Sequence, residues 1–325
     1  MRQAIFAGIA ALLFSAGLPL FLFSDIEQQP VEEILLVIEQ PIELPEIKSV
    51  ELQVQVGASV QKMELEEYLV GVVLSEMPAS FHPEAMKAQA VAARTFAMRQ
   101  LQNGKHEFFD VCTSAACCQA WSSQKQFAEK LGNGCELYLE KVKQAVLETE
   151  GEVLCYDGAL IDAVYFSCSG GTTEDAAAVW GSEVPYLQSV NSAGEEYSRN
   201  FETEVLVPFD QFCVILQEEN PDTSFSESYY SWFGAVTRTD GNGVLTMEIG
   251  NQLFSGTQLR SLFNLKSTNF TTVITERGIV FEVKGYGHRV GMSQYGANAM
   301  ANNGSNYEDI LRHYYTGVKI TKNIP

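Results

Sequence analysis

The sequence predicts an α+β fold with a cleft, built on two neighbouring helices of the N-terminal half and a strand–loop–helix unit near the C-terminus. Three observations support this expectation. They are an amphipathic helical pattern at 65–76, an alanine-rich helical pattern at 83–101, and short stretches in which apolar and polar residues alternate as in half-buried strands. The 325 residues suffice for one large domain or two modest ones, and 46% hydrophobic with 19% charged residues is ordinary for a globular protein.

An apolar segment at 4–23 precedes the globular part and has the length needed to cross a bilayer. No convincing small-x-small cleavage site follows it, so the sequence favours an uncleaved transmembrane anchor at 1–24 over a signal peptide. Arg2 before the segment and acidic residues after it place the N-terminus inside and the body outside the membrane. An acidic tether with prolines is expected at 25–48, and the folded domain at 49–325.

The net charge of −20 restricts the partners of the protein. No run of lysine or arginine compensates this charge, which argues against nucleic acid and against anionic lipid surfaces. A neutral polymer or a small neutral molecule is a compatible substrate.

The first helix, expected at 65–76, carries the candidate catalytic residue Glu76. Its apolar residues recur at the spacing of one buried face, and Glu76 follows Val72 and Val73 within that face. A carboxyl group there must be paired or stay protonated with a raised pKa, because burying the charge is costly. A protonated glutamic acid at neutral pH is what an enzyme needs to protonate a leaving-group oxygen. The alternative is a frayed helix end, with Glu76 in water or paired with an arginine.

The second helix, expected at 83–101, begins with Pro83 in its first turn and is rich in alanine, which suits close helix packing. Gln89 and Arg94 are the polar exceptions on its apolar flanks. Two interpretations stand side by side for this pair. Either both side chains reach into the site from the helix that packs against the first one, or each binds a backbone carbonyl.

The remaining elements of the N-terminal half follow from turn and strand signals. A half-buried strand is expected at 50–56, and a long loop at 105–134. A helix at 135–149 and a hairpin at 152–166, turning at Asp157-Gly158, come next.

A smaller lobe is expected at about 195–275, inserted between the two halves of the site. Its elements are expected as helices at 208–216 and 255–263 and strands at 244–249 and 271–274. The C-terminal part is expected as a strand at 280–284, a loop and helix up to 301, and a last helix with a capping box of Ser305 and Glu308 that ends at Gly317.

The loop at 105–134 holds the candidate metal ligands His106, Cys112 and Cys118. One histidine and two thiolates in a short loop suit tetrahedral zinc, although this spacing is not a standard zinc-finger one. A disulfide is the alternative and fits a location outside the membrane. The seven cysteines are an odd number, which excludes a complete set of internal disulfides. Whether a zinc ion would be structural or would keep an open position toward the substrate stays undecided at this level.

Several segments, taken together, resemble the stage II sporulation protein D (SpoIID) family of lytic transglycosylases. They are LEEYLVGVVLSEMP from Leu65, EAMKAQAVAARTF from Glu84, SGG with VWGSEVPYLQSV from Ser169, and GYGHRVGMSQYGANAMA with YYTGVKI from Gly285. The segments span about residues 47–320 in the family's order, which is far more specific than any single motif.

The resemblance implies cleavage of the MurNAc–GlcNAc bond of peptidoglycan glycan strands, with the glutamate of the EMP motif, Glu76, as the catalytic acid. A retaining hydrolase would need a second carboxylate about 5 Å away, and an inverting one about 6.5–9.5 Å away. A lytic transglycosylase needs neither, because the MurNAc 6-hydroxyl attacks its own C1 and leaves a 1,6-anhydro end. Glu76 would first protonate the glycosidic oxygen and then accept the 6-hydroxyl proton.

The resemblance also assigns walls to the cleft. The glycines of the 285–301 segment would bring the chain close to a glycan, and His288 is expected to position substrate rather than to catalyse. The expected substrate-binding residues are Gln89, Arg94, Ser169, Gly170, Gly171, His288, Ser293, Gln294 and Tyr295. Trp180 and Tyr186 offer flat faces for sugars.

Two further expectations concern the loop and a departure from the family. Some clostridial members hold zinc with one histidine and two cysteines in this loop, which favours zinc here, and no organic cofactor is implied. Members usually carry a histidine before an STSGG-like turn. Here Phe166 and Cys168 interrupt that pattern, so no role is carried onto Phe166.

The implied biology is that of a single-pass membrane enzyme of an endospore-forming bacterium. It would act on glycan strands during engulfment, in the space between the mother-cell and forespore membranes. The implied partners are the sporulation amidase, stage II sporulation protein P, and stage II sporulation protein M as scaffold. The rival hypotheses are a glycan-binding module, since some SpoIID-like proteins are described as amidase enhancers, and a zinc hydrolase that uses His106 and the cysteines.

Overall fold

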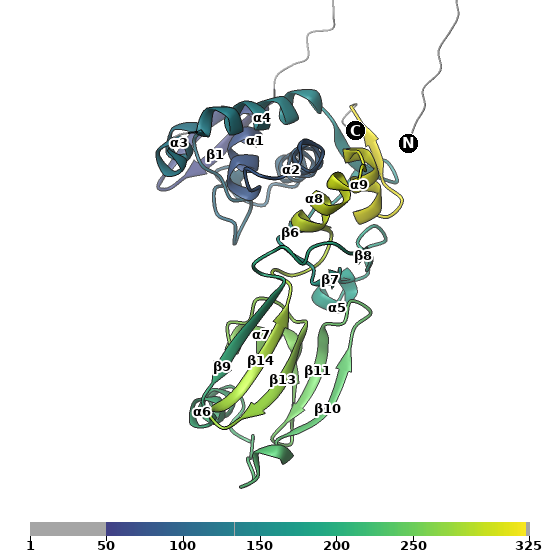
Figure 1. Cartoon of the computed structure of the whole chain (residues 1–325). Coiled ribbons are helices and arrows are strands. Elements are labelled where there is room, and N and C mark those ends of the chain that lie inside the picture. Colours follow the sequence, from purple (N-terminus) through teal and green to yellow (C-terminus); the bar gives the residue numbers. More distant parts are fainter. Residues whose placement is uncertain (1–49, 133, 323–325) are drawn as a thin grey trace, which may run out of the picture. The chain divides into compact units, whose positions relative to one another are not determined.

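The computed structural model describes residues 50–132 and 134–322, which form a mixed α/β protein (Figure 1). The mixed helix and strand content confirms the coarse fold class. Within those two ranges, no helix has both the length and the apolar character needed to cross a bilayer. The anchor at 1–24 and the tether at 25–48 lie outside the described residues and stay predictions.

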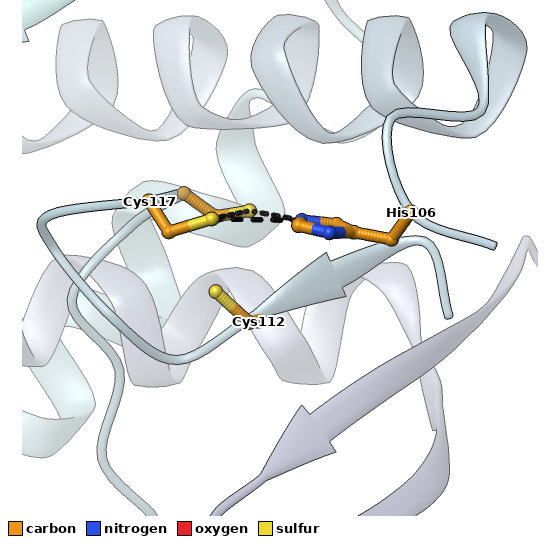
Figure 2. Close-up of side chains that lie close together, drawn as sticks. His106, Cys112 and Cys117 are labelled. Atoms are coloured by element: carbon orange, nitrogen blue, oxygen red, sulfur yellow. Dashed lines mark hydrogen bonds between the residues drawn. The ribbon is translucent and has the colours of Figure 1, made fainter. Parts of the chain in front are cut away.

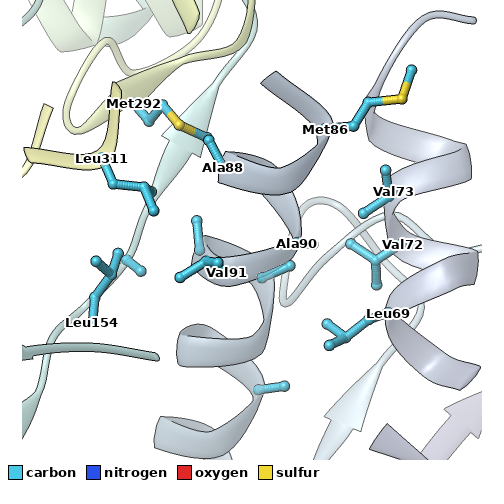
Figure 3. Close-up of a cluster of buried hydrophobic side chains, with 14 of the residues drawn as sticks. Leu69, Val72, Val73, Met86, Ala88, Ala90, Val91, Leu154, Met292 and Leu311 are labelled. Atoms are coloured by element: carbon cyan, nitrogen blue, oxygen red, sulfur yellow. The ribbon is translucent and has the colours of Figure 1, made fainter. Parts of the chain in front are cut away.

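The first helices are α1 (Leu65–Glu76) and α2 (Pro83–Asn103), which confirms both predicted elements. Pro83 opens α2, the His82 ring accepts the Glu84 N–H, and Gly104 ends the helix in the left-handed region. Figure 3 shows the packing of α1 against α2, and the side chains drawn there include Leu69, Val72, Val73, Met86 and Ala90. The alanines of α2 let the helix backbones approach, as their frequency predicted.

A three-stranded sheet lies beside these helices. The strands β1 (Glu51–Val56) and β2 (Ser59–Glu64) form an antiparallel hairpin, and β3 (Val111–Cys112) pairs with β1 in parallel. The loop predicted at 105–134 is therefore fixed to the sheet near its middle.

The helix α3 (Gln124–Leu131) was not predicted. It has no fully buried residue, and its Phe127 packs against the main core only in part. The signal that marks it is the capping box between Ser123 and Gln126. The next helix, α4 (Cys135–Glu148), is confirmed and packs against α1 and α2.

The predicted hairpin is confirmed only in its first part. The strands β4 (Val153–Tyr156) and β5 (Ala159–Leu160) pair across the Asp157-Gly158 turn. The chain then leaves this sheet, and β6 (Tyr165–Phe166) pairs in parallel with β15 (Met292–Ser293). This long-range pairing brings the chain just before the family segment at Ser169 together with the family segment that begins at Gly285. The remaining short elements are α5 (Ala176–Trp180), β7 (Gly171–Thr172), β8 (Asn191–Ser192) and β16 (Lys319–Thr321).

A second hydrophobic core, centred on Phe212, Leu259 and Phe281, lies in the region of the predicted lobe. Its elements are the sheet β13 (Phe270–Thr275), β14 (Gly278–Lys284) and β9 (Glu202–Val207), the sheet β10 (Phe233–Arg238), β11 (Val244–Ile249) and β12 (Gln252–Ser255), and the helices α6 (Phe209–Glu219), η1 (Tyr229–Ser231) and α7 (Gly256–Leu262). The strands β9 and β10 were not predicted. The residues of this core run to Val283, so β14 shares it with the lobe.

The C-terminal helices are α8 (Gln294–Asn302) and α9 (Tyr307–Tyr314). The capping box predicted at Ser305 is wrong. Asn306 is the N-cap instead, because its side-chain oxygen accepts the Asp309 N–H at 2.9 Å. The helix also ends at Tyr314 rather than at Gly317, since the backbone is already extended at the next residue.

Candidate functional site

A cavity of about 250 Å³ opens at the C-terminal end of α1. Its wall comes from α1, α2, the loop before α3, the β6 segment and the turn before β15. The lining residues are Glu76, Phe96, Ala115, Cys118, Gln119, Ala163, Val164, Tyr165, Phe166, Ser167, Tyr286, Gly287 and His288. Among these described residues, Glu76 alone carries a carboxyl group.

Glu76 is the last residue of α1 and is half-buried. Its Oε1 accepts the Ala120 N–H at 2.9 Å, and its Oε2 accepts the Gln294 side-chain amide at 3.1 Å. Burial raises the pKa of Glu76 above the ordinary glutamic acid value, although both hydrogen bonds act in the opposite direction. A carboxyl group with a raised pKa beside a cavity is suited to donate a proton and, once ionised, to accept one.

The loop that supplies the Ala120 N–H is held against α1. The Trp121 ring lies over Gly71, where an added Cβ would be 2.1 Å from Trp121 Nε1. The Ser122 N–H donates to the Gly71 carbonyl at 3.3 Å, and the hydroxyls of Ser75 and Ser122 lie 2.8 Å apart. Gly71 is therefore the residue that lets this loop reach the carboxyl group of Glu76.

Gln119 organises the floor of the cavity, and sequence reasoning missed it. Its side chain accepts the Tyr68 hydroxyl at 3.3 Å and donates to the Tyr165 hydroxyl at 2.9 Å. Burial, together with the nearby Glu76 carboxylate, raises the pKa of Tyr165 well above the usual tyrosine value, so its hydroxyl stays protonated. No local pattern marks Gln119 or Tyr165, because only the tertiary fold brings them to Glu76.

His288 lies in the cavity wall as a neutral ring. Burial lowers the pKa of His288 to about 4, and the positive charge of Arg260 acts in the same direction. Its Nδ1 accepts the Val290 N–H at 3.1 Å. The ring packs against Phe166 and Trp180, with centroids 5.6 and 5.4 Å apart. A neutral imidazole fits the predicted positioning role better than that of a cationic acid.

The other predicted residues of the 285–301 segment have separate places. Gln294 contacts Glu76 directly, a closer association with the candidate acid than was predicted. Ser293 caps α8 by accepting the Gly296 N–H at 3.2 Å. Tyr295 packs on Phe81, with ring centroids 4.9 Å apart. Neither Ser293 nor Tyr295 is among the residues that line the cavity.

Ser169, Gly170 and Gly171 do not line the cavity either. The backbone N–H groups of Ser169 and Gly170 donate to the buried Glu195 carboxylate at 2.6 and 3.2 Å. The Ser169 hydroxyl donates to the same carboxylate and accepts the Gly171 N–H. These groups already have hydrogen-bond partners inside the protein. The predicted substrate contact stays a prediction.

Gly170 lies in the family segment that begins at Ser169, and Gly285 and Gly287 lie in the one that begins at Gly285. These glycines allow close contact with neighbouring chain segments. A Cβ on Gly170 would lie 2.8 Å from the Gly285 nitrogen, and a Cβ on Gly285 would lie 2.7 Å from the Ser169 oxygen. Gly287 likewise faces the Phe166 side chain, 2.8 Å from its Cβ. At these glycines one chain segment approaches another closely. The close approach of backbone to a ligand, which we predicted for them, stays a prediction.

Arg94 and Gln89 differ in their surroundings. Arg94 is fully buried and forms an ion pair with Glu66 at 2.6 Å, and it also donates to the carbonyls of Val146 and Glu152. It therefore serves the core, as the second interpretation held. Gln89 is fully buried, and neither polar atom of its side chain has a hydrogen-bond partner within residues 50–132 and 134–322.

The predicted metal ligands gather in one cluster. The ligand atoms of His106, Cys112, Cys117 and Cys118 all lie within 4.8 Å of one another. Figure 2 shows the side chains of His106, Cys112 and Cys117 converging. All seven cysteines lie in the described ranges, and none of them forms a disulfide there. Cys117 was not among the predicted ligands.

The spacing of these atoms fits a tetrahedral zinc ion. Zinc–sulfur bonds of about 2.3 Å and zinc–nitrogen bonds of about 2.0–2.1 Å place neighbouring ligand atoms roughly 3.5–3.8 Å apart. His106 Nε2 lies 3.3 Å from Cys118 Sγ and 3.7 Å from Cys117 Sγ. The Sγ atoms of Cys117 and Cys118 are 4.0 Å apart. Cys118 also lines the cavity, so the cluster borders the Glu76 site.

Comparison with known proteins identifies the family. The family model "Stage II sporulation protein" matches residues 55–156. "Stage II sporulation protein D" of Bacillus amyloliquefaciens is 38% identical over 270 residues, which cover 81% of this chain and 76% of that protein. The protein of the same name from Bacillus subtilis (strain 168) is 37% identical over 268 residues, with the same coverage. "Amidase enhancer" of Bacillus subtilis is 28% identical over 313 residues, covering 78% of this chain and 40% of that protein. Similarity over most of both chains shows that this chain belongs to the stage II sporulation protein D family.

Proposed function

We propose that this chain is a lytic transglycosylase that cleaves the MurNAc–GlcNAc bonds of peptidoglycan during sporulation. The observation that carries the proposal is the single carboxyl group of the cavity. Glu76 stands there with a raised pKa and with no acidic partner among the described lining residues. The names of the relatives support a role in sporulation.

The proposed mechanism uses Glu76 twice. The protonated carboxyl group donates its proton to the glycosidic oxygen, and the C1–O bond breaks. The MurNAc 6-hydroxyl then attacks C1 of the same sugar, and the Glu76 carboxylate accepts the hydroxyl proton. The C1–O6 bond forms, and the enzyme returns to its starting protonation state. The hydrogen bonds from Ala120 and Gln294 stabilise the carboxylate between the two steps.

Among the described residues that line the cavity, no second carboxyl group faces Glu76, and this favours the proposed route over hydrolysis. Retaining and inverting glycosidases both place two carboxyl groups around the scissile bond. The walls opposite Glu76 consist instead of aromatic, amide and neutral imidazole groups, among them Tyr165, Gln119 and His288. An internal nucleophile removes the need for a carboxylate that activates water.

The test is mass spectrometry of products from glycan strands digested in heavy-oxygen water. We expect 1,6-anhydroMurNAc ends without solvent oxygen. Reducing ends that carry the label would show hydrolysis and contradict the proposal. Binding without any cleavage would support the rival hypothesis of a glycan-binding module instead.

Zinc is proposed as the metal of the loop cluster, held by His106, Cys112 and Cys118. When bound, it would hold this loop together as a structural cross-link.

The setting is part of the same proposal. The enzyme would be anchored by residues 1–24, with its catalytic domain outside the mother-cell cytoplasm in the space between the mother-cell and forespore membranes. Stage II sporulation protein P would remove stem peptides first, and stage II sporulation protein M would serve as scaffold. Because stem peptides add carboxylates, a chain of net charge −20 should prefer denuded strands. Equal rates on denuded and peptide-bearing strands would contradict this preference.

A further inference from the structure

A second hollow, a groove of about 870 Å³, lies next to the Glu76 cavity. Its wall comes from the end of α1, from α3 and from the loop that precedes α3. Ala115 lines both hollows, and Ser75 and Met77, the chain neighbours of Glu76, line the groove. Ala120, whose N–H the Glu76 Oε1 accepts, lines it as well. The groove and the cavity therefore meet at the candidate acid.

The sizes of the two hollows indicate that a polymer would need both. Pockets for small molecules usually have about 300–1,000 Å³. The cavity, at about 250 Å³, lies just below this range, and the groove lies in its upper part. An enzyme that cleaves within a glycan strand holds sugars on both sides of the scissile bond. A strand with its scissile bond at Glu76 therefore has the cavity for one side and the groove for the other.

The walls of the groove suit a sugar that carries negative charge. The rings of Trp121, Phe127 and Tyr138 line it and offer flat apolar surface for the C–H groups of a sugar ring. Tyr138 is fixed at the end of α1, because its hydroxyl donates to the Met77 carbonyl. The chain has 41 aspartates and glutamates, yet none of them is among the described residues that line the groove. An anionic ligand therefore meets no carboxylate on these walls.

Lys130 supplies the positive charge of the groove. It lies in the last turn of α3 and is exposed. Within residues 50–132 and 134–322, its ammonium group forms no ion pair. Among the described residues that line either hollow, it is the only one with a positive charge, because the His288 ring is neutral. A free ammonium group on a wall without carboxylates is suited to bind a carboxylate of the ligand.

We propose that the groove is a second sugar subsite, in which Lys130 binds the free lactyl carboxylate of a MurNAc residue. The inference rests on the proposed function and deepens it, because it names the group that distinguishes denuded from peptide-bearing strands. In a denuded strand the lactyl group of each MurNAc ends in a carboxylate. A stem peptide converts that carboxylate into a neutral amide, which an ammonium group binds less strongly. Since MurNAc and GlcNAc alternate, any two successive sugars in the groove include one MurNAc, whichever direction the strand takes.

The first test measures the binding of two tetrasaccharides of alternating GlcNAc and MurNAc by calorimetry. The Glu76→Gln variant is used, so that no bond is cleaved. One ligand has free lactyl carboxylates, and the other carries them as methylamides, which have the shape of the peptide link without the charge. At about 0.15 M salt, where distant acidic residues are screened, we expect the free acid to bind about two- to fivefold more tightly, the usual effect of an exposed ion pair. Equal affinities would overturn the inference.

Lys130→Gln and the matched variant Lys125→Gln assign this preference to one lysine. Both lysines lie on α3, and Lys125 is not among the residues that line the groove. Lys130→Gln should abolish the preference for the free acid and leave the affinity for the methylamide unchanged. Lys125→Gln should keep both affinities. An undiminished preference in Lys130→Gln would contradict the role of this lysine.

A third measurement tests the groove itself by filling it. Ala79 is exposed and lines the groove, whereas Ala235 is an exposed alanine on β10. The tetrasaccharide should bind more tightly than the disaccharide, and Ala79→Trp should remove this gain while Ala235→Trp keeps it. A gain that survives Ala79→Trp would overturn the subsite. These binding results do not depend on cleavage, and the products of the wild type in heavy-oxygen water test the proposed function separately, so each can fail alone.

Discussion

Glu76 and Glu195 are both enclosed by the protein, yet their surroundings differ in the number of hydrogen-bond donors. Glu195 is fully buried and accepts from the Cys168 thiol, the backbone N–H groups of Ser169 and Gly170, and the hydroxyls of Ser169 and Ser192. Glu76 is half-buried, beside a cavity. The structure gives it two donors, one on each carboxyl oxygen.

This difference separates a structural carboxylate from a candidate acid. A carboxylate offers about four lone-pair sites, and the donors around Glu195 use them fully. Glu195 therefore joins the turn before β7 to the segment after β8 and has no capacity left for a ligand. Glu76 keeps lone pairs free toward the cavity, and its raised pKa leaves a proton to give. The supply of donors, more than burial, distinguishes the two sites.

The largest effect is expected from Glu76→Gln, which removes the proton donor and keeps the shape. The rate of glycan cleavage should fall about 10²–10⁴-fold, the usual contribution of a general acid–base. Release of anhydro ends, followed by mass spectrometry, measures the rate. A variant that keeps more than a tenth of the wild-type rate would contradict the assignment of Glu76.

The same variant should not lose stability at neutral pH. A carboxyl group whose pKa is higher in the folded than in the unfolded protein stabilises the fold below the unfolded pKa, and this contribution is lost as the pH rises through the folded pKa. Replacing Glu76 by glutamine removes that loss. Its amide oxygen can still accept the Ala120 N–H, and the Gln294 amide can rotate to turn its own oxygen toward the new amide nitrogen. Denaturant unfolding should therefore show equal or greater stability of Glu76→Gln at pH 7, and a smaller advantage at pH 4.

Glu195→Gln is the matched change at the other carboxylate and should act on stability. An amide nitrogen would face donors that need an acceptor, and each buried group left without a proper partner costs about 1–3 kcal/mol. The free energy of unfolding should fall by about that amount in denaturant titrations. Undiminished stability, or a loss of cleavage rate without a loss of stability, would show that Glu195 is not the structural partner described above.

Local sequence patterns predicted those parts of the site that lie within a single helix or loop. The periodicity of α1 placed Glu76 on the buried face, and proline and alanine signals marked α2. The family motifs identified the cavity wall at His288. Each of these inferences needs residues that lie within one turn or one helix of each other.

The partners of these residues escaped prediction because tertiary packing brings them together. Ala120 reaches Glu76 across 44 positions, and its donor is a backbone N–H, which carries no sequence signature. Glu195 was not predicted either. The serine and glycines at 169–171, whose segment donates to it, resemble a ligand-binding turn, so the sequence pointed to a ligand and not to a buried carboxylate. Cys117 was missed because His106, Cys112 and Cys118 are evenly spaced along the chain, and this even spacing selected Cys118. In the lobe, β10 is exposed along almost its whole length, and the apolar residues of β9 are confined to its second half, Val205 to Val207.

Gln294→Leu should change the pH dependence of cleavage by a moderate amount. The Gln294 amide donates to the Glu76 carboxylate and so lowers its pKa, and removing it should raise that pKa further. The acid form then persists to higher pH. The descending limb of the pH–rate profile should move upward by about one to two pH units, since a hydrogen bond to a charged group is worth about 1.5–3 kcal/mol.

Ser293→Ala is the control for that shift. It removes the cap of the same helix, α8, which costs about 0.5–2 kcal/mol of stability. The pH–rate profile of Ser293→Ala should keep its descending limb where the wild type has it. Equal shifts in both variants would mean that the position of α8, rather than the Gln294 hydrogen bond, governs Glu76.

The smallest expected effect concerns two buried glutamines, Gln119 and Gln89, which differ in their number of hydrogen-bond partners as the two glutamates do. Gln119 has partners for both polar atoms, whereas Gln89 has none in the described structure. Gln89→Met should therefore raise the free energy of unfolding by about 1 kcal/mol, because an unpaired buried amide costs about 1–3 kcal/mol. Gln119→Met should lower it. Calorimetry or denaturant unfolding measures both changes, and a loss of stability in Gln89→Met would reveal a partner for this amide.

Gln89 shares a face of α2 with Ala93 and with Phe96 of the cavity wall, at helical spacings of four and seven residues. A stable Gln89→Met variant with weaker glycan binding would therefore support the predicted substrate contact, and unchanged binding would assign Gln89 to the core alone.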